Sequence, residues 1–209
     1  KKEHTMNTPT EVRINSADGG SLGLFSLALV TLVGSSGLFG MTPDPNAAAW
    51  ILCLGAFAQI LAAFIGFKSG NIFGGTVFGG YGLFWLGMGC RELFISGFFG
   101  EAGQASMTAG ASTEMALVCL GYLIFSIMMF IASLETNKML AIVVGLIVLL
   151  FFGLTLTFFG ASGIGGMIAN LSRIVLSVVS FYGAGAVIFN TMFGREFWPV
   201  GKPLGKFVK

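Results

Sequence analysis

Charged side chains are scarce in this sequence. Only 10% of the 209 residues are Asp, Glu, Lys or Arg, whereas 55% are hydrophobic, and the mean hydropathy is +0.89. A soluble domain carries about 25% charged residues. A chain of this size cannot form a water-exposed surface with so few charged residues. The sequence therefore predicts an integral membrane protein. The net charge of +2 follows the membrane and predicts no nucleic-acid partner.

The residue types that carry enzyme chemistry are also few. The one histidine, His4, lies in the polar N-terminal segment, and Cys53, Cys90 and Cys119 fall in apolar runs without the spacing of metal ligands. No acidic residue is expected at mid-membrane depth, where a charge is costly and usually functional. The sequence therefore predicts no enzyme, no metal site and no cofactor, and it argues against an ion pump or a carboxylate proton relay.

Long apolar runs are what the sequence has in abundance. They extend over about 20 residues without alternation, as from Met139 to Gly160, which is typical of membrane helices rather than barrel strands. The stretches TPDPN, KSGN, ETNK and GASGIGG interrupt them, and the longest connection is Ser96–Thr113. We predict an all-α integral membrane protein of six transmembrane helices around a narrow pore: Ser21–Met41, Asn46–Phe67, Asn71–Ile95, Glu114–Leu134, Met139–Gly160 and Gly165–Phe193.

The basic residues orient these six helices. If the helices alternate in direction, every Lys and Arg except Arg91 and Arg173 falls on one side of the membrane. Positive residues accumulate in the cytoplasm, so both termini are predicted to be cytoplasmic. The expected organisation is a polar N-terminal tail over 1–20, a transmembrane domain over 21–194 and a basic C-terminal tail over 195–209, in a multi-pass protein of the cell (plasma or inner) membrane.

The stretch GNIFGGTVFGGYGLFWL, residues 70–86, carries three different stripes when it is placed on a helix. Small residues let membrane helices approach closely, so the glycine stripe predicts a packing or assembly surface. The stripe of polar-tipped aromatics beside it predicts the wall of a path. The remaining face is expected to meet lipid or a neighbouring subunit. The glycine stripe is Gly75, Gly79 and Gly82; the aromatic stripe is Asn71, Phe78, Tyr81 and Trp85; the outer face is Ile72, Phe73, Thr76, Val77, Leu83 and Phe84.

Other helices supply further candidates for a narrow, uncharged path. Leu24, Leu27 and Thr31 share a face of the first helix, Gln59 lies midway in the second, and Asn190 lies in the sixth. Thr31 has an alternative role, since a threonine in a membrane helix could bond its own backbone. Tyr81 and Trp85 could belong to an interfacial aromatic belt. The candidates for lining the pore or binding substrate are Leu24, Thr31, Gln59, Asn71, Phe78, Trp85 and Asn190.

Three stretches resemble a known family. GNIFGGTVFGGYGLFW closely resembles the G-N-x-F-x-x-T-x-F-x-x-Y-G-x-F-W signature of the acetate uptake transporter family, NTMFGREFWPVG resembles its C-terminal ending, and GAFAQILAAFIGFKSGN resembles its second helix. The likeness covers Ser21 to Gly201. The chain departs from the family where DGGSLGL replaces N-P-A-P-L-G-L, and at Gly66 and Thr191, where relatives often carry a glutamate.

The resemblance implies a homo-hexamer in which each protomer has its own pore for acetate and similar small monocarboxylates. It also implies a constriction made by one residue each from the first, third and fifth helices, which by position are Leu27, Tyr81 and Ile147. Passive and proton-linked transport both remain open, as does transport of succinate. The alternative is a channel for a small neutral solute such as urea, an amide or water. Arg173 could attract anions or extend to the membrane interface.

Overall fold

The computed structural model describes residues 17–35, 46–109 and 111–207. Within these ranges the chain forms helices and no strands, which confirms the all-α prediction. The elements are α1 (Gly20–Gly34), α2 (Asn46–Trp50), the π-helix η2 (Ile51–Ala58), α3 (Gln59–Lys68), α4 (Ile72–Ile95), α5 (Glu101–Ala109), α6 (Ala111–Ser133), α7 (Lys138–Phe158) and α8 (Ser162–Phe193).

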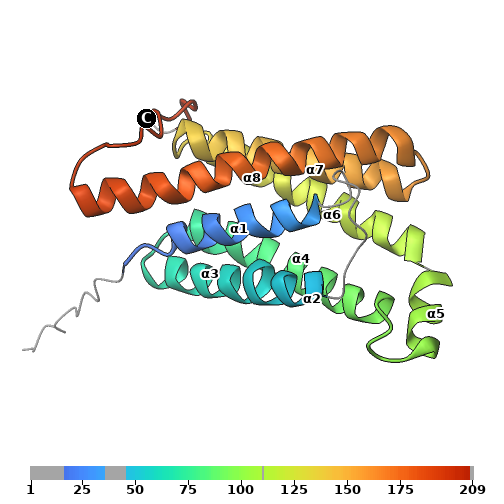
Figure 1. Ribbon diagram of the computed structural model, residues 1–209. Coiled ribbons are helices and arrows are strands. Elements are labelled where there is room, and N and C mark those ends of the chain that lie inside the picture. Colours follow the sequence, from blue (N-terminus) through green and yellow to red (C-terminus); the bar gives the residue numbers. More distant parts are fainter. Residues whose placement is uncertain (1–16, 36–45, 110, 208–209) are drawn as a thin grey trace, which may run out of the picture.

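The helices form an elongated bundle with two distinct ends (Figure 1). The start of α1 and the end of α8 lie at one end, here called the termini end, and α5 lies at the other, the α5 end. In this view α1 runs between a layer that contains α7 and α8 and a layer that contains α3 and α4. Helix α1 packs against α8, η2 and α3, so it joins the two layers.

Among the described residues, four stretches are long and apolar enough to cross a membrane: Ala47–Lys68, Thr113–Ser133, Lys138–Phe158 and Ser162–Phe193. Helix α4 has 24 residues, about 36 Å at 1.5 Å per residue, but its seven glycines make it less apolar. The described part of α1 has 15 residues, and the predicted end of this helix at Met41 lies outside the described residues. The six spans and the cytoplasmic termini therefore stay predictions.

Two predicted connections contain more helix than we expected. The connection Ser96–Thr113 contains α5 and the start of α6, and α8 begins at Ser162, within the stretch GASGIGG. A Cβ atom on Gly165 would lie 2.6 Å from the carbonyl oxygen of Gly153 in α7. Glycine lowers helix propensity in isolation. The close approach of α8 to α7 that these two glycines permit outweighs this cost.

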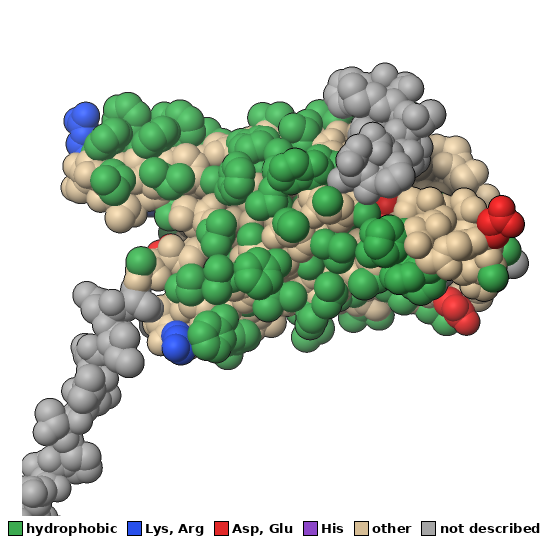
Figure 2. Space-filling view, turned by 60° about the horizontal axis from the view of Figure 1, so that its bottom comes forward, with side chains coloured by type: hydrophobic (Ala, Val, Ile, Leu, Met, Phe, Trp, Pro, Cys, Tyr) green, Lys and Arg blue, Asp and Glu red, His purple; other side chains and the backbone are tan. Residues whose placement is uncertain are grey.

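The outer flank of the bundle is apolar (Figure 2). Large side chains project from several helices, including Phe57 at 70% exposure, Ile72 at 76% and Val178 at 65%. Lys and Arg side chains lie at the termini end of this face, and the most prominent Asp and Glu side chains lie at the opposite end. This distribution supports a helical membrane protein.

Candidate functional site

The glycine stripe of α4 packs within the chain, against α3 and η2. A Cβ atom on Gly66 of α3 would lie 2.8 Å from the backbone nitrogen of Gly75. A Cβ atom on Gly82 of α4 would lie 2.9 Å from the side chain of Ile60 and 3.3 Å from the carbonyl oxygen of Ala56. The two helices thus approach backbone to backbone, as small residues allow in membranes. The stripe is a packing surface between two elements of one protomer.

The face of α4 that we expected to point outward is divided. Ile72 and Leu83 are exposed, at 76% and 59%, but Val77 and Phe84 are buried at 6% each, so the prediction was wrong for these two. Phe84 meets the rings of Tyr122 in α6 and Phe151 in α7, both with centroids 4.9 Å away. Helices α6 and α7 cover this part of α4, which a single helical wheel cannot reveal.

Two cavities lie along the inner face of α4. The larger, of about 420 Å³, opens at the termini end, and the smaller, of about 10 Å³, lies further toward the α5 end. The larger cavity is lined by, among others, Leu24, Asn71, Phe78, Asn137, Asn190 and Val200. The smaller is lined by Phe84, Trp85, Leu150, Phe151 and Leu176, together with three residues that also line the larger cavity.

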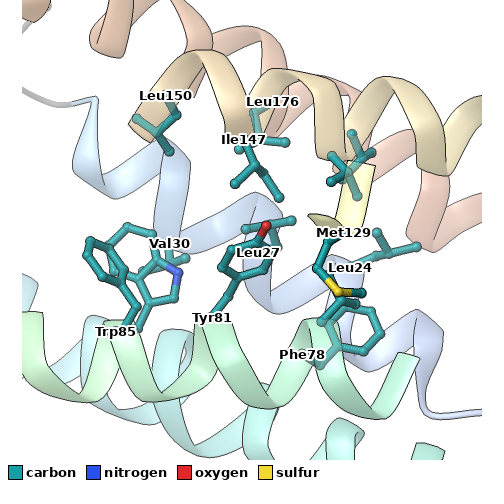
Figure 3. Packing of buried hydrophobic residues seen from close by; sticks show 14 of the residues in the cluster. Leu24, Leu27, Val30, Phe78, Tyr81, Trp85, Met129, Ile147, Leu150 and Leu176 are labelled. Atoms are coloured by element: carbon teal, nitrogen blue, oxygen red, sulfur yellow. The ribbon is translucent and has the colours of Figure 1, made fainter. Parts of the chain in front are cut away.

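The three shared residues are Leu27 from α1, Tyr81 from α4 and Ile147 from α7. They are exposed by 4%, 3% and 2%, respectively. Figure 3 shows Tyr81 reaching from α4 toward Ile147, with Leu27 beside it. The structure thus brings together the three residues that the family resemblance implies for a constriction, at the level where the two cavities meet.

The Tyr81 hydroxyl belongs to a hydrogen-bonded chain between α4 and α6. It donates to Ser126 Oγ at 3.0 Å, and the Ser126 hydroxyl donates to the Tyr122 carbonyl at 2.6 Å. The Tyr122 hydroxyl in turn donates to the Gly80 carbonyl at 3.0 Å. Because its proton is directed to Ser126, the Tyr81 oxygen has only acceptor capacity left for any other group.

Two of the predicted path residues line neither cavity. The Thr31 hydroxyl donates to the carbonyl of Leu27 in its own helix at 2.7 Å, as its alternative role predicted. Gln59 is fully buried at the junction of η2 and α3, and its side-chain nitrogen and oxygen have no hydrogen-bond partner. Both residues lie between helices rather than along the cavities.

The two predicted asparagines line the larger cavity but have structural partners. Asn71 caps α4 by accepting from the Gly74 nitrogen at 2.8 Å. Asn190 accepts from the nitrogens of Phe197 and Trp198 at 2.7 and 2.9 Å, and donates to the Trp198 carbonyl at 2.8 Å. It thereby holds the C-terminal segment, predicted as a tail, against α8, so that Val200 reaches the cavity.

The aromatic candidates are buried. Phe78 lines the larger cavity at 7% exposure and Trp85 the smaller at 6%, so neither Tyr81 nor Trp85 has the exposed position of a belt residue. Sequence reasoning missed Tyr122, Ser126 and the inward position of Phe84. A tyrosine and a serine four residues apart share a face of α6, and this pair was the available signal.

The site and the fold together define a class: a helical membrane protein with two internal cavities that share three lining residues. Comparison with known proteins then identifies the family. The chain belongs to the GPR1/FUN34/yaaH family, whose model matches residues 4–195.

Relatives span nearly the whole chain. It is 27% identical over 198 residues to the succinate-acetate/proton symporter SatP of Escherichia coli, covering 89% of this chain and 96% of that protein. It is 28% identical over 200 residues to an uncharacterized protein of Methanothermobacter thermautotrophicus, covering 95% and 98%. The solved structure of the bacterial acetate channel SatP has the same fold, with a TM-score of 0.78 and 24% identity over 90% of this chain and 100% of that one. A symporter among its relatives fits the prediction of a protein that is not an enzyme.

Proposed function

We propose that this protein transports acetate and similar small monocarboxylates across the cell membrane through a pore in each protomer. The observation that supports the proposal is the position of Leu27, Tyr81 and Ile147, which line both the larger and the smaller cavity. Membership of a family that includes a succinate-acetate/proton symporter supports the substrate class. The proposal includes six spans per protomer, cytoplasmic termini and assembly as a homo-hexamer.

The constriction excludes hydrated ions in this proposal. Leu27 and Ile147 offer only hydrocarbon, and a narrow apolar passage resists wetting. The ring of Tyr81 fills the rest, held by the ring of Phe125 at 5.5 Å and that of Phe151 at 6.1 Å. A small acid with one short alkyl group fits this environment better than an ion with its water shell.

The same residues favour the protonated acid over the free carboxylate. Among the described residues that line the two cavities, only Asp18 carries a charge, and it is exposed at the termini end. A bare carboxylate in the constriction would lack a hydrogen-bond donor, and its burial is costly. A protonated acid can donate to the free acceptor position on Tyr81. Uptake therefore accompanies a proton and rises as the pH falls.

Purified protein in proteoliposomes tests this function. Labelled acetate should enter faster than in empty vesicles, and the rate at constant total acetate should rise from neutral to acid pH. Labelled urea and osmotic water flow are measured in the same vesicles. Fast urea or water movement without acetate uptake would establish the neutral-solute channel instead. Acetate uptake that is flat or increases toward neutral pH would contradict proton-linked transport.

A further inference from the structure

An apolar groove lies on the flank of the bundle, between α7, α8 and the C-terminal segment. Its volume is about 470 Å³, and each of these three parts of the chain contributes lining residues. Ile142 of α7 and Val178 of α8 line the groove and are 44% and 65% exposed. The groove therefore opens to the surroundings of the bundle rather than to its core.

The C-terminal segment forms one wall of this groove, because it folds back from the end of α8 onto the start of α7 (Figure 1). The Met139 nitrogen donates to the Val200 carbonyl at 2.9 Å, and the Tyr182 hydroxyl donates to the Pro199 carbonyl at 2.7 Å. The rings of Tyr182 and Trp198 stack with centroids 5.0 Å apart. These contacts hold the wall in place and occupy the Tyr182 hydroxyl.

Lys138 gives the groove one positively charged end. It is the charged residue among those that line the groove, and within the described part of the chain its ammonium forms no hydrogen bond or ion pair. Lys138 is the first residue of α7, where the partial positive charge of the helix N-terminus adds to its own. Two acidic residues of this region line no part of the groove and accept from backbone nitrogens instead: Glu135 from Phe207 at 2.8 Å and Glu196 from Val200 at 3.4 Å.

The groove becomes apolar with distance from this end. Lys138 begins the stretch Lys138–Phe158, which is apolar enough to cross a membrane, and Ile142 lies one turn further along it. Val178 lies one turn before Tyr182 in α8, which runs antiparallel to α7 (Figure 1). A cation at the membrane boundary and hydrocarbon deeper in the membrane match an amphiphile that has an anionic head and an apolar chain.

A phospholipid suits this groove better than a second copy of the chain. Lysine is depleted in interfaces between proteins, and a second copy would have to bring an acidic group to Lys138. The most prominent acidic side chains lie at the opposite end of the flank (Figure 2). Anionic phospholipids, in contrast, place their charge at the membrane boundary, and basic pockets between membrane helices on the cytoplasmic side bind such headgroups.

We propose that this groove binds an anionic phospholipid of the cytoplasmic leaflet, with the phosphate at Lys138 and the start of an acyl chain against Ile142 and Val178. The choice of leaflet rests on the cytoplasmic termini of the proposed function, whereas the site itself does not. Met139 and Val200 line both the groove and the larger cavity. A lipid bound here therefore packs against the wall of the proposed pathway.

The test adds phosphatidylglycerol or phosphatidylcholine with the same acyl chains to the purified protein in detergent and follows its unfolding temperature. We expect phosphatidylglycerol to raise the unfolding temperature of wild type further than phosphatidylcholine does. In Lys138→Gln the apparent affinity for phosphatidylglycerol should fall about fivefold, the usual contribution of one lysine beside an anionic lipid surface. This variant should fold, because a helix N-terminus disfavours a cation. Lys68→Gln, which removes an exposed lysine at the end of α3 outside the groove, is the matched control and should behave like wild type.

A second pair of variants tests the apolar part of the groove. Val178→Trp places a large ring in the groove and should reduce the stabilisation by phosphatidylglycerol, whereas Val175→Trp, at an exposed position of α8 outside the groove, should retain it. Equal effects of the two lipids on wild type, or a wild-type preference in Lys138→Gln or Val178→Trp, would overturn the site. A changed oligomeric state of Lys138→Gln in size-exclusion chromatography would also overturn it, since the groove would then belong to a contact with a second copy. None of these measurements involves transport, so the lipid site and the proposed function can fail separately.

Discussion

The two sides of α4 meet their neighbours in opposite ways. Toward α3 and η2 the backbones themselves make contact, since even a methyl group on Gly66 would clash with the backbone of Gly75. Toward α6 and α7 the space is filled by rings, with Phe151 in contact with both Tyr81 and Phe84. On the glycine side α4 contributes no side chain to the contact, whereas its other side consists of large side chains.

In the proposed function, one side of α4 supports the packing of the bundle and the other lines the pathway. The glycine side fixes the distance between α4 and α3, because backbone atoms in contact cannot move aside as a flexible side chain can. The aromatic side then holds Tyr81 at a fixed position where it lines both cavities. A change on the glycine side should therefore affect the stability of the whole protein. A change on the aromatic side should affect which solutes pass through the proposed pathway.

The largest effect is expected for Gly66→Ala. The new Cβ would lie 2.8 Å from the Gly75 nitrogen and 3.1 Å from its Cα, so the helices must separate. Overpacking of this kind costs about 1–3 kcal/mol. We expect a lower unfolding temperature in detergent and loss of acetate uptake. Gly79→Ala is the control, because its Cβ would meet Ala63 at 3.4 Å, an ordinary contact. Equal stability of the two variants would refute the close-packed role of Gly66.

The next effect is expected for Tyr81→Ala, which empties the aromatic side at the constriction. Removal of the ring joins the cavities of about 420 and 10 Å³. We expect a leak of small ions and uptake of larger acids such as succinate, measured with labelled substrates in proteoliposomes. If the variant folds and its selectivity for acetate over succinate is that of wild type, Tyr81 does not form the gate.

A smaller effect is expected for Tyr81→Phe, which keeps the ring and removes the acceptor. One hydrogen bond contributes about 0.5–1.5 kcal/mol net, so acetate uptake at acid pH should fall by up to about tenfold without any leak. Ser126→Ala is the control, since it leaves the Tyr81 oxygen in place and should retain uptake. An unchanged rate in Tyr81→Phe would show that the hydroxyl serves only the bond to Ser126.

The smallest effect on transport is expected for Gln59→Met. Gln59 lines neither cavity, and its buried amide has no partner. Methionine has a similar volume and no polar group to leave unsatisfied. We expect unchanged acetate uptake and an equal or higher unfolding temperature, since an unsatisfied buried group costs about 1–3 kcal/mol. A loss of uptake in a stable variant would place Gln59 on the pathway, as the sequence alone predicted.

Much of α4 could be predicted from its sequence because helical periodicity decides which residues share a stripe. The glycine stripe, and the alignment of Tyr81 with Phe78 and Trp85, needed only the rotation of 100° per residue. The inward position of Phe84 could not be predicted in this way, because Phe84 lies on the side of α4 that α6 and α7 happen to cover. Apolar residues suit lipid and protein interior equally well, so their type does not distinguish the two.

The sequence by itself determined the all-helical membrane class, since too few charges and long apolar runs leave no other solution. The tertiary structure alone decided which polar groups find partners. It directs the proton of Tyr81 to Ser126, engages Asn190 with the C-terminal segment, and leaves the Nε atoms of Arg91 and Arg173 without a partner. The physical reason is that hydrogen bonds act over about 3 Å. Tyr81 and Ser126, 45 positions apart, reach this distance only when the helices have packed, and Asn190 reaches Phe197 only when the C-terminal segment folds back on α8.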